Sequence, residues 1–354
     1  MKRLLAELRP FLAAIALIIA IAAVLVYSDG AGRRTDTPTQ RLPHVAIIQH
    51  ASQAALDDGV AGIIAGLAAH GYVDGQSVVL QKFNAQGDLA TANDIAHQAT
   101  DGSFDLVITA STVSMQSVAN VNQQSKVRHI FGVVTDAART GVGVGPGPLD
   151  HPAYMAGYNA LVPVDRAIKL ALRMNPALKR LGLVWHTAEA NSKIYADATR
   201  AACAALGLTL LEANADGASA VGEAAASLAA RGVDAFLVTG DVVVLVGVDA
   251  LIRVADRAGV PVFSVVPPNS KKGAIFDIGA DYRSIGMDVG NLAAEVLGGR
   301  DLATVAIENR VPPMFVLNEL ALARFAPKWR LPADLREQAD VVIDKDGEHH
   351  PKTP

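Results

Sequence analysis

From residue 44 onward, short apolar runs alternate with longer segments whose apolar residues recur at helical spacing. The short runs are typical of buried strands, and the longer segments are typical of helices that pack on a sheet. In the first half, the predicted strands are 44–48, 78–83, 106–109 and 129–134, and the predicted helices are 54–70, 89–100 and 113–125. This alternation predicts a parallel α/β sheet with right-handed crossovers.

The same order starts again after residue 180. The second set of predicted strands is 181–185, 209–213, 235–239 and 262–266, with helices over 191–206, 218–230 and 245–258 and a last helix over 282–297. The repetition predicts two similar Rossmann-like lobes joined by a hinge. The general repetitiveness of α/β chains remains an alternative explanation for the similarity between the two halves.

The domain organisation follows from this repeat. We assign 1–28 to a signal peptide or membrane anchor and 29–43 to a linker rich in Gly, Arg, Thr and Pro. The first lobe then takes 44–160 plus about 282–310, and the second takes 161–281 plus about 311–330. Residues 331–354 form a tail whose charged end, from 344, is expected to be frayed.

The amino-terminal segment has the charge pattern of a membrane-directed helix. Lys2, Arg3 and Arg9 precede an uncharged run over 11–27. This run exceeds the usual apolar region of a signal peptide and is at the short end for a spanning helix, so both fates remain open. We favour an uncleaved inner-membrane anchor, because no clean cleavage site follows, and the positive flank then predicts a periplasmic location for the rest.

Composition excludes some classes of function. The chain has 354 residues, of which 51% are hydrophobic, enough for two cores, and its formal net charge is −4. The chain therefore lacks the basic field that a phosphate backbone requires, and no nucleic-acid partner is expected. The single cysteine excludes an internal disulfide.

Polar residues gather at the ends of the predicted strands. In open α/β sheets, ligands bind in the crevice outside the carboxyl ends of the strands, so these residues predict a binding cleft between the lobes. The candidate ligand-binding residues are Gln49, Ser52, Ser111, Thr112, Thr135, Asp136, Glu189, Asn191, Ser192, Thr239, Asp241 and Asp277.

The chemistry of these residues favours a zwitterion. Ser111 and Thr112 precede a helix, where hydroxyls and backbone N–H groups can hold a carboxylate, although an ordinary helix cap would have the same sequence. The carboxylates among the candidates can receive an ammonium, although each alone is a common turn former. The predicted ligand is a small molecule with both groups, such as an amino acid.

Motifs for chemistry are missing from the sequence. There is no nucleophile elbow, no zinc-protease motif and no His/Cys cluster at metal spacing, and the Gly/Pro stretch over 141–148 cannot open a helix as a dinucleotide loop must. No catalytic residue, metal or cofactor is therefore expected. Two rivals stay open: a sensing domain for a signalling partner, and an enzyme with Asp241 or Glu189 as general base.

Several segments resemble the ABC-transporter substrate-binding proteins related to tryptophan- and tyrosine-binding lipoproteins. The most specific are Asn-Ala-Gln-Gly-Asp at 84–88 and Glu-Ala-Asn-Ser at 189–192, and the others are 55–57, 67–75, 91–92, 133–136, 272–274 and 281–286. The resemblance implies a type I periplasmic-binding-protein fold, closure around one amino acid, often aromatic, and delivery to an ABC permease in the inner membrane.

The resemblance also places ligand contacts. It implies that the contacts are Ser111, Thr112, Thr135, Asp136, Glu189, Asn191, Ser192 and Asp277. The chain departs from the family at Thr239-Gly240-Asp241, where Thr-Asp-Asn is usual, and it lacks the lipid-accepting cysteine. The departures leave the identity of the ligand and the route of delivery open.

Overall fold

The computed structural model describes residues 17–24 and 41–351. Residues 17–24 are helical and exposed, and the rest of the predicted anchor over 11–27 lies outside the described residues, as does most of the predicted linker. Within the described residues, no helix combines the length and the apolar character needed to cross a membrane.

The first sheet is built from parallel strands. Its order is β11-β5-β4-β3-β1-β2, and every printed pairing in it is parallel. The strands are β1 (His44–Gln49), β2 (Val79–Asn84), β3 (Leu106–Ala110), β4 (His129–Val134), β5 (Met155–Asn159) and β11 (Glu308–Asn309). The predicted parallel sheet of the first half is thereby confirmed.

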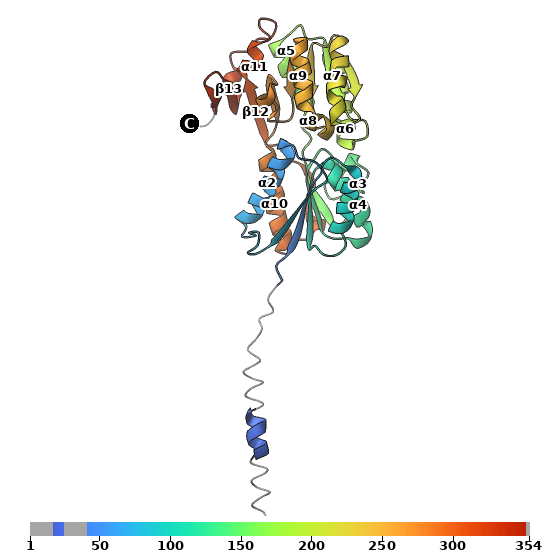
Figure 1. The fold of residues 1–354 in the computed structure, drawn as a ribbon, viewed down its shortest axis with the longest axis vertical. Coiled ribbons are helices and arrows are strands. Elements are labelled where there is room, and N and C mark those ends of the chain that lie inside the picture. The colour runs from blue at the N-terminus through green and yellow to red at the C-terminus, as the bar shows by residue number, and fades with distance from the viewer. Residues whose placement is uncertain (1–16, 25–40, 352–354) are drawn as a thin grey trace, which may run out of the picture. The chain divides into compact units, whose positions relative to one another are not determined.

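Helices cover both faces of this sheet, and we call the assembly the first lobe. Alternate strand residues face opposite sides: Val45 and Ile47 pack with one set of helices, and Ala46 and Ile48 with the other. The first set is α2 (Ala54–Ala69) and α10 (Tyr282–Leu297), and the second is α3 (Leu89–Ala99) and α4 (Thr112–Ser125). Figure 1 shows α2 and α10 side by side although the sequence separates them widely.

Glycines permit this close approach of α2 and α10. A Cβ at Gly62 would lie 2.1 Å from the carbonyl oxygen of Arg283, and a Cβ at Gly286 would lie 2.0 Å from that of Gly59. Any side chain at these positions would force the helices apart. The amino-terminal ends of both helices are thereby fixed together beside the cleft described below.

The second sheet has the order β14-β13-β12-β10-β9-β8-β6-β7. Its strands are β6 (Arg180–Trp185), β7 (Thr209–Asn214), β8 (Ala235–Val238), β9 (Val262–Ser264), β10 (Phe276–Ala280), β12 (Pro313–Asn318), β13 (Val341–Asp344) and β14 (Gly347–His349). Its helices are α5 (Val164–Met174), α6 (Ala190–Leu206), α7 (Val221–Ala230), α8 (Val242–Val246), α9 (Val248–Ala258), α11 (Glu319–Ala323) and α12 (Leu335–Gln338). We call this assembly the second lobe.

The structure corrects several expectations for the second lobe. The helix predicted over 245–258 is two helices, α8 and α9, which meet at Gly247. The helix predicted over 218–230 opens with a 3-10 turn over 218–220. Residues 344–349 are not frayed as expected, because β13 pairs with β12 and β14 pairs with β13. The sheet is also mixed, since β12 runs antiparallel to β10 and β14 runs antiparallel to β13, whereas β12 and β13 are parallel.

The chain passes between the two sheets three times. It does so between β5 and α5, between β10 and α10, and between β11 and β12. The connections are short: 160–163, Asp281 and 310–312. Ala160, which belongs to the first connection, and Tyr282, which follows the second, line the cavity between the lobes.

Candidate ligand-binding cleft

Two neighbouring cavities lie between the lobes. The inner cavity measures about 30 Å³ and the outer groove about 720 Å³, and Val242 contributes to the walls of both. The inner cavity is lined by Gln53, Ala55, Leu56, Ser111, Thr112, Val133, Thr135, Ala160, Asn191, Tyr195, Gly240, Val242, Leu245 and Tyr282. Both sheets therefore direct residues that follow their strands toward the same space.

The wall from the first lobe consists of hydroxyl groups at the start of α4. Ser111 is the N-cap of this helix, and its Oγ accepts a hydrogen bond from the Ser114 backbone N–H at 3.0 Å. Thr112 Oγ1 accepts from the Thr135 backbone N–H at 3.0 Å, which ties α4 to the end of β4. The side chains of Ser111, Thr112 and Thr135 are buried and neutral. Hydroxyls beside a helix N-terminus suit a carboxylate.

The end of β4 is shaped by an irregularity. The register between β4 and β5 shifts between Phe131 and Val134, and Val133 has a φ of 54°. This left-handed backbone is unusual for a β-branched residue and is maintained only where the surroundings impose it. The bulge brings Val133 and Thr135 to the inner cavity, as bulges beside binding sites commonly re-aim side chains.

The wall from the second lobe carries carboxyl groups. Glu189 is 8% exposed, and its Oε2 accepts hydrogen bonds from Asn191 Nδ2 at 2.9 Å, from the Val242 backbone N–H at 3.2 Å and from Ser192 Oγ at 3.4 Å. Burial, and then the neighbouring Asp241, raise the pKa of Glu189 to about 7.

Asp241 lies behind Glu189 and is fully buried. Its Oδ1 accepts from the Val244 backbone N–H at 2.9 Å, which caps α8, and its Oδ2 accepts from the His186 backbone N–H at 2.6 Å. Burial raises the pKa of Asp241 despite these hydrogen bonds. Within the described residues, neither Glu189 nor Asp241 forms an ion pair with a lysine or an arginine.

Asn191 connects the carboxyl groups to the inner cavity. Its Nδ2 donates to Glu189 Oε2 and, at 2.8 Å, to the carbonyl oxygen of Gly240. Its Oδ1 is buried and has no partner among the described residues, and the side chain lines the inner cavity. An unpaired buried acceptor is costly, so this oxygen is suited to a ligand N–H group.

The sequence pattern of the family described as ABC transporter substrate-binding protein matches residues 44–326. The chain belongs to this family. Proteins of this family bind solutes outside the cytoplasm for ABC transporters and are not enzymes. The rival interpretation of Glu189 or Asp241 as the general base of an enzyme is thereby answered.

Known proteins are similar to this substrate-binding protein in sequence or in fold. A protein of Clostridioides difficile (strain R20291) named tyrosine-binding protein is 25% identical over 293 residues, which cover 82% of this chain and 83% of the relative. A conserved domain protein of Vibrio cholerae O1 biovar El Tor has a TM-score of 0.81 at 25% identity, with 85% of this chain and all of that chain covered. An ABC domain from Streptococcus pneumonia in complex with L-Trp has a TM-score of 0.80 at 20% identity, with the same coverage.

Aromatic and aliphatic residues complete the inner cavity of the substrate-binding protein. Tyr195 and Tyr282 are buried, and burial raises the pKa of Tyr195 to about 12. The Tyr195 hydroxyl accepts a hydrogen bond from the Val162 backbone N–H at 3.3 Å. A Cβ at Gly240 would lie 2.6 Å from Tyr195 Cε2, so the small residue in Thr239-Gly240-Asp241 makes room for this ring. No pattern in the sequence predicts either tyrosine as a site residue.

The predicted site residues of the substrate-binding protein fall into two groups. Ser111, Thr112, Thr135 and Asn191 line the inner cavity, Ser52 and Glu189 line the outer groove, and Ser192 lies beside Glu189. In the described part of the chain, the predicted site residues that line neither cavity are Gln49, Asp136, Ser192, Thr239, Asp241 and Asp277.

The residues of the second group have other partners or positions. Gln49 Nε2 donates to Asp57 Oδ1 at 2.8 Å. Asp277 is not at a strand end as predicted, because it is the second residue of β10. Its Oδ2 accepts from the Ser270 backbone N–H at 2.7 Å, and burial raises its pKa to about 7.

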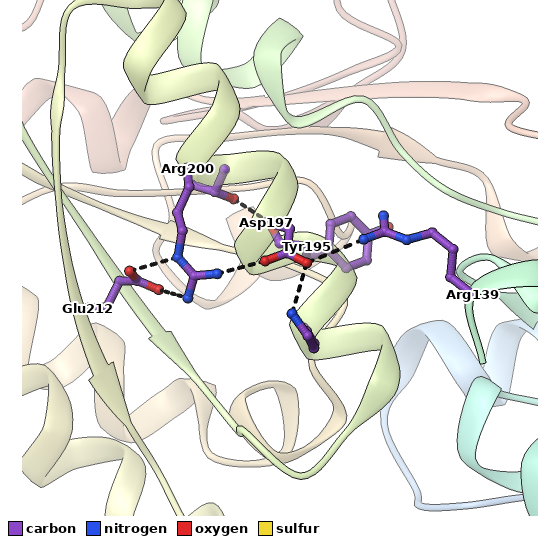
Figure 2. A network of polar contacts seen from close by, with 7 residues as sticks. Arg139, Tyr195, Asp197, Arg200 and Glu212 are labelled. Atoms are coloured by element: carbon purple, nitrogen blue, oxygen red, sulfur yellow. Dashed lines mark hydrogen bonds and ion pairs between the residues drawn. The ribbon is translucent and has the colours of Figure 1, made fainter. Parts of the chain in front are cut away.

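An ion pair connects the two lobes beside the cleft. Arg139 Nη2 of the first lobe lies 3.3 Å from Asp197 Oδ2, on α6 of the second lobe. Figure 2 shows that Asp197 belongs to a network in which Arg200 contacts both Asp197 and Glu212. Lys193 Nζ also lies 3.1 Å from Asp197 Oδ2. Asp197 is thus held in place by its own lobe and presented to Arg139.

Proposed function

We propose that this substrate-binding protein takes an amino acid, with aromatic ones as the first candidates, into the cleft between its lobes. The observation that carries the proposal is the opposite chemistry of the two walls. Neutral hydroxyls at the start of α4 lie on one side, and the carboxyl group of Glu189 with the amide of Asn191 lies on the other. A carboxylate suits the first wall and an ammonium suits the second.

The relatives support this choice of ligand class. One is named for tyrosine binding, and a solved structure of the same fold is in complex with L-Trp. The apolar part of the inner cavity, with Leu56, Tyr195 and Tyr282, offers contacts for an amino-acid side chain. Glu189, Asn191, Ser111, Thr112 and Thr135 are the proposed contacts to the charged groups.

The proposal includes closure of the lobes on the ligand by a hinge of the type I kind. An inner cavity of about 30 Å³ has room for about one or two water molecules, which is far less than an amino acid occupies. The lobes must therefore separate to admit the ligand, and the three short connections between the sheets are the proposed hinge. Closure is then a population shift driven by contacts made to both walls.

Delivery to a permease is the remaining part of the proposal. The family supports an ABC permease as partner, and the uncharged run over 11–27 supports tethering of the protein to the inner membrane. Fractionation tests the tether: an anchored protein stays with the membrane after a high-salt wash and is released only by detergent. Recovery in the soluble periplasmic fraction would contradict it.

The ligand is identified by thermal-shift measurements and calorimetry on the full-length chain with the standard L-amino acids. A ligand at 100 times its Kd is expected to add about 2.7 kcal/mol to the free energy of unfolding. The N-acetyl derivative and the carboxamide of the best ligand serve as matched probes, since each removes one charge. Both should bind more weakly. If no amino acid binds, or if both derivatives bind as well as the parent, the proposed function is wrong.

A further inference from the structure

The two buried carboxyl groups of the cleft share the same small environment. Ser192 is a hydrogen-bonding partner of both Glu189 and Asp241, and a single hydroxyl proton can serve only one of them at a time. Glu189 also accepts from the backbone N–H of Val242, the residue that follows Asp241. The two carboxyl groups are therefore held against the same turn at the start of α8.

The groups around Glu189 and Asp241 do not neutralise the negative charge that the two carboxylates would carry. His186, on the loop after β6, also faces the pair, and it weakly favours the ionised forms. The outer groove, which Glu189 lines, adds the carboxylates of Asp88 and Asp216 and the imidazole of His50. Burial lowers the pKa of His50 and so favours its neutral form. The described residues around the groove supply carboxylates and imidazoles but no lysine or arginine.

Two adjacent buried carboxylates without a cation are unfavourable, and a bound proton relieves the repulsion. A ligand ammonium would relieve it as well. The unpartnered Oδ1 of Asn191 is an independent sign that a hydrogen-bond donor belongs at this place, because Asn191 is 2% exposed and lines the inner cavity next to Glu189.

We propose that the Glu189–Asp241 pair holds one proton in the ligand-free protein, and that the ammonium of the ligand displaces it. This inference rests on the proposed function, which places an ammonium at Glu189 and Asn191. The O–H bond of the protonated carboxyl group breaks, the proton leaves to water through the outer groove, and the ammonium keeps its own protons while it donates to Glu189 and to Asn191 Oδ1. Asp241 acts as a positioning residue that sets the proton affinity of Glu189 without touching the ligand.

The coupling fixes the sign of the pH dependence. Glu189 has a pKa of about 7 without ligand, and an adjacent ammonium lowers it. Binding therefore releases a proton below that pH, and affinity weakens by up to about tenfold for each pH unit of acidification. Above it, Glu189 is already ionised and affinity is flat.

The experiment counts protons during binding. Titration calorimetry of the full-length protein with its amino acid is run near pH 6 in two buffers of different ionisation enthalpy, and Kd is measured from about pH 5.5 to 8.5. We expect nearly one proton released per ligand near pH 6, falling toward zero at the alkaline end. A proton count of zero throughout, with a pH-independent Kd, would overturn the inference. Absence of amino-acid binding at every pH would instead refute the proposed function.

Variants assign the proton to the pair. Glu189→Gln should abolish proton release and leave a weak, pH-independent affinity, whereas Glu223→Gln on the exposed surface of α7 should behave like the wild type. Asp241→Asn removes one charge, so the pH at which affinity falls should move downward by about one unit. Unchanged proton release in Glu189→Gln would place the proton elsewhere and overturn the assignment. If Asp241→Asn does not fold, the proton counts of the wild type and of Glu189→Gln still show whether ligand binding releases a proton from the pair.

Discussion

The two walls of the cleft share one architecture and differ in charge. Each is formed by residues that follow parallel strands and begin a helix: Ser111 and Thr112 after β3, and Glu189 and Asn191 after β6. The first wall is neutral and presents hydroxyls, whereas the second presents carboxyl groups. The fold thus supplies the position of each wall, and a few residues after each strand decide which end of a zwitterion it suits.

The largest effect is expected at the wall of the second lobe, from Asn191→Ala. The substitution removes the unpaired Oδ1 at the cavity and the Nδ2 that bridges Glu189 and Gly240. We expect a loss of about 1.5–3 kcal/mol of binding free energy, or roughly 10- to 150-fold in Kd, since hydrogen bonds to a charged group are lost. Calorimetry measures it.

Asn291→Ala is the matched control, since Asn291 lies on α10 away from the interlobe cavities and lines a different surface pocket. The control should retain wild-type affinity. Equal affinities in Asn191→Ala and in the control would weaken the contrast between the walls, because the Asn191 side chain would then contribute no contact to the ligand.

At the wall of the first lobe, Ser111→Ala should weaken binding of the amino acid by about 1–2 kcal/mol. The carboxamide of the ligand lacks the negative charge. The Ser111→Ala substitution should therefore reduce the binding free energy of the carboxamide by less than it reduces that of the parent amino acid. Ser227→Ala, an exposed serine on α7, controls for the loss of a hydroxyl. Equal losses for parent and carboxamide would show that this wall does not recognise the carboxylate.

These walls also show what the sequence could predict. Parallel strands with polar residues after them were visible from apolar runs and the residues that follow, and Ser111, Thr112, Thr135 and Asn191 do meet at one cavity. The rule for open sheets is local to each strand end, so it works without knowledge of the packing.

The remaining site residues depend on packing that no local pattern reveals. Tyr195 is the sixth residue of α6 and Tyr282 opens α10, and both reach the cavity only because these helices converge there. Asp277 has the composition of a site residue but lies within β10. The sequence pattern does not predict β10, β12 and β13, because these short strands are stabilised by pairing with one another across long stretches of the chain.

Asp277 is a buried acid that lies away from the cleft, and it can be compared with the carboxyl groups of the second wall. Asp277 has a folded-state pKa raised to about 7 from an ordinary 3.8, so its ionisation opposes folding. The stabilising contribution of its proton is complete below about pH 4 and is lost as the pH rises through about 7.

Asp277→Asn should therefore raise the free energy of unfolding by on the order of 1 kcal/mol near pH 8, with little gain near pH 4. Denaturant unfolding at both pH values measures it, and calorimetry should show unchanged ligand affinity. A large loss of affinity would return Asp277 to the ligand site, as the family resemblance implies.

The smallest effect is expected from Arg139→Ala, which removes the ion pair between the lobes (Figure 2). Both side chains are partly exposed, and such pairs contribute about 0.2–1 kcal/mol, so Kd should rise by less than about sixfold. The loss should shrink at high salt, because exposed charges are screened. Arg173→Ala breaks an ion pair to Asp334 within the second lobe and is the control. If both variants lose the same affinity, or if salt leaves the loss unchanged, the pair does not favour closure and the contrast between the walls alone governs binding.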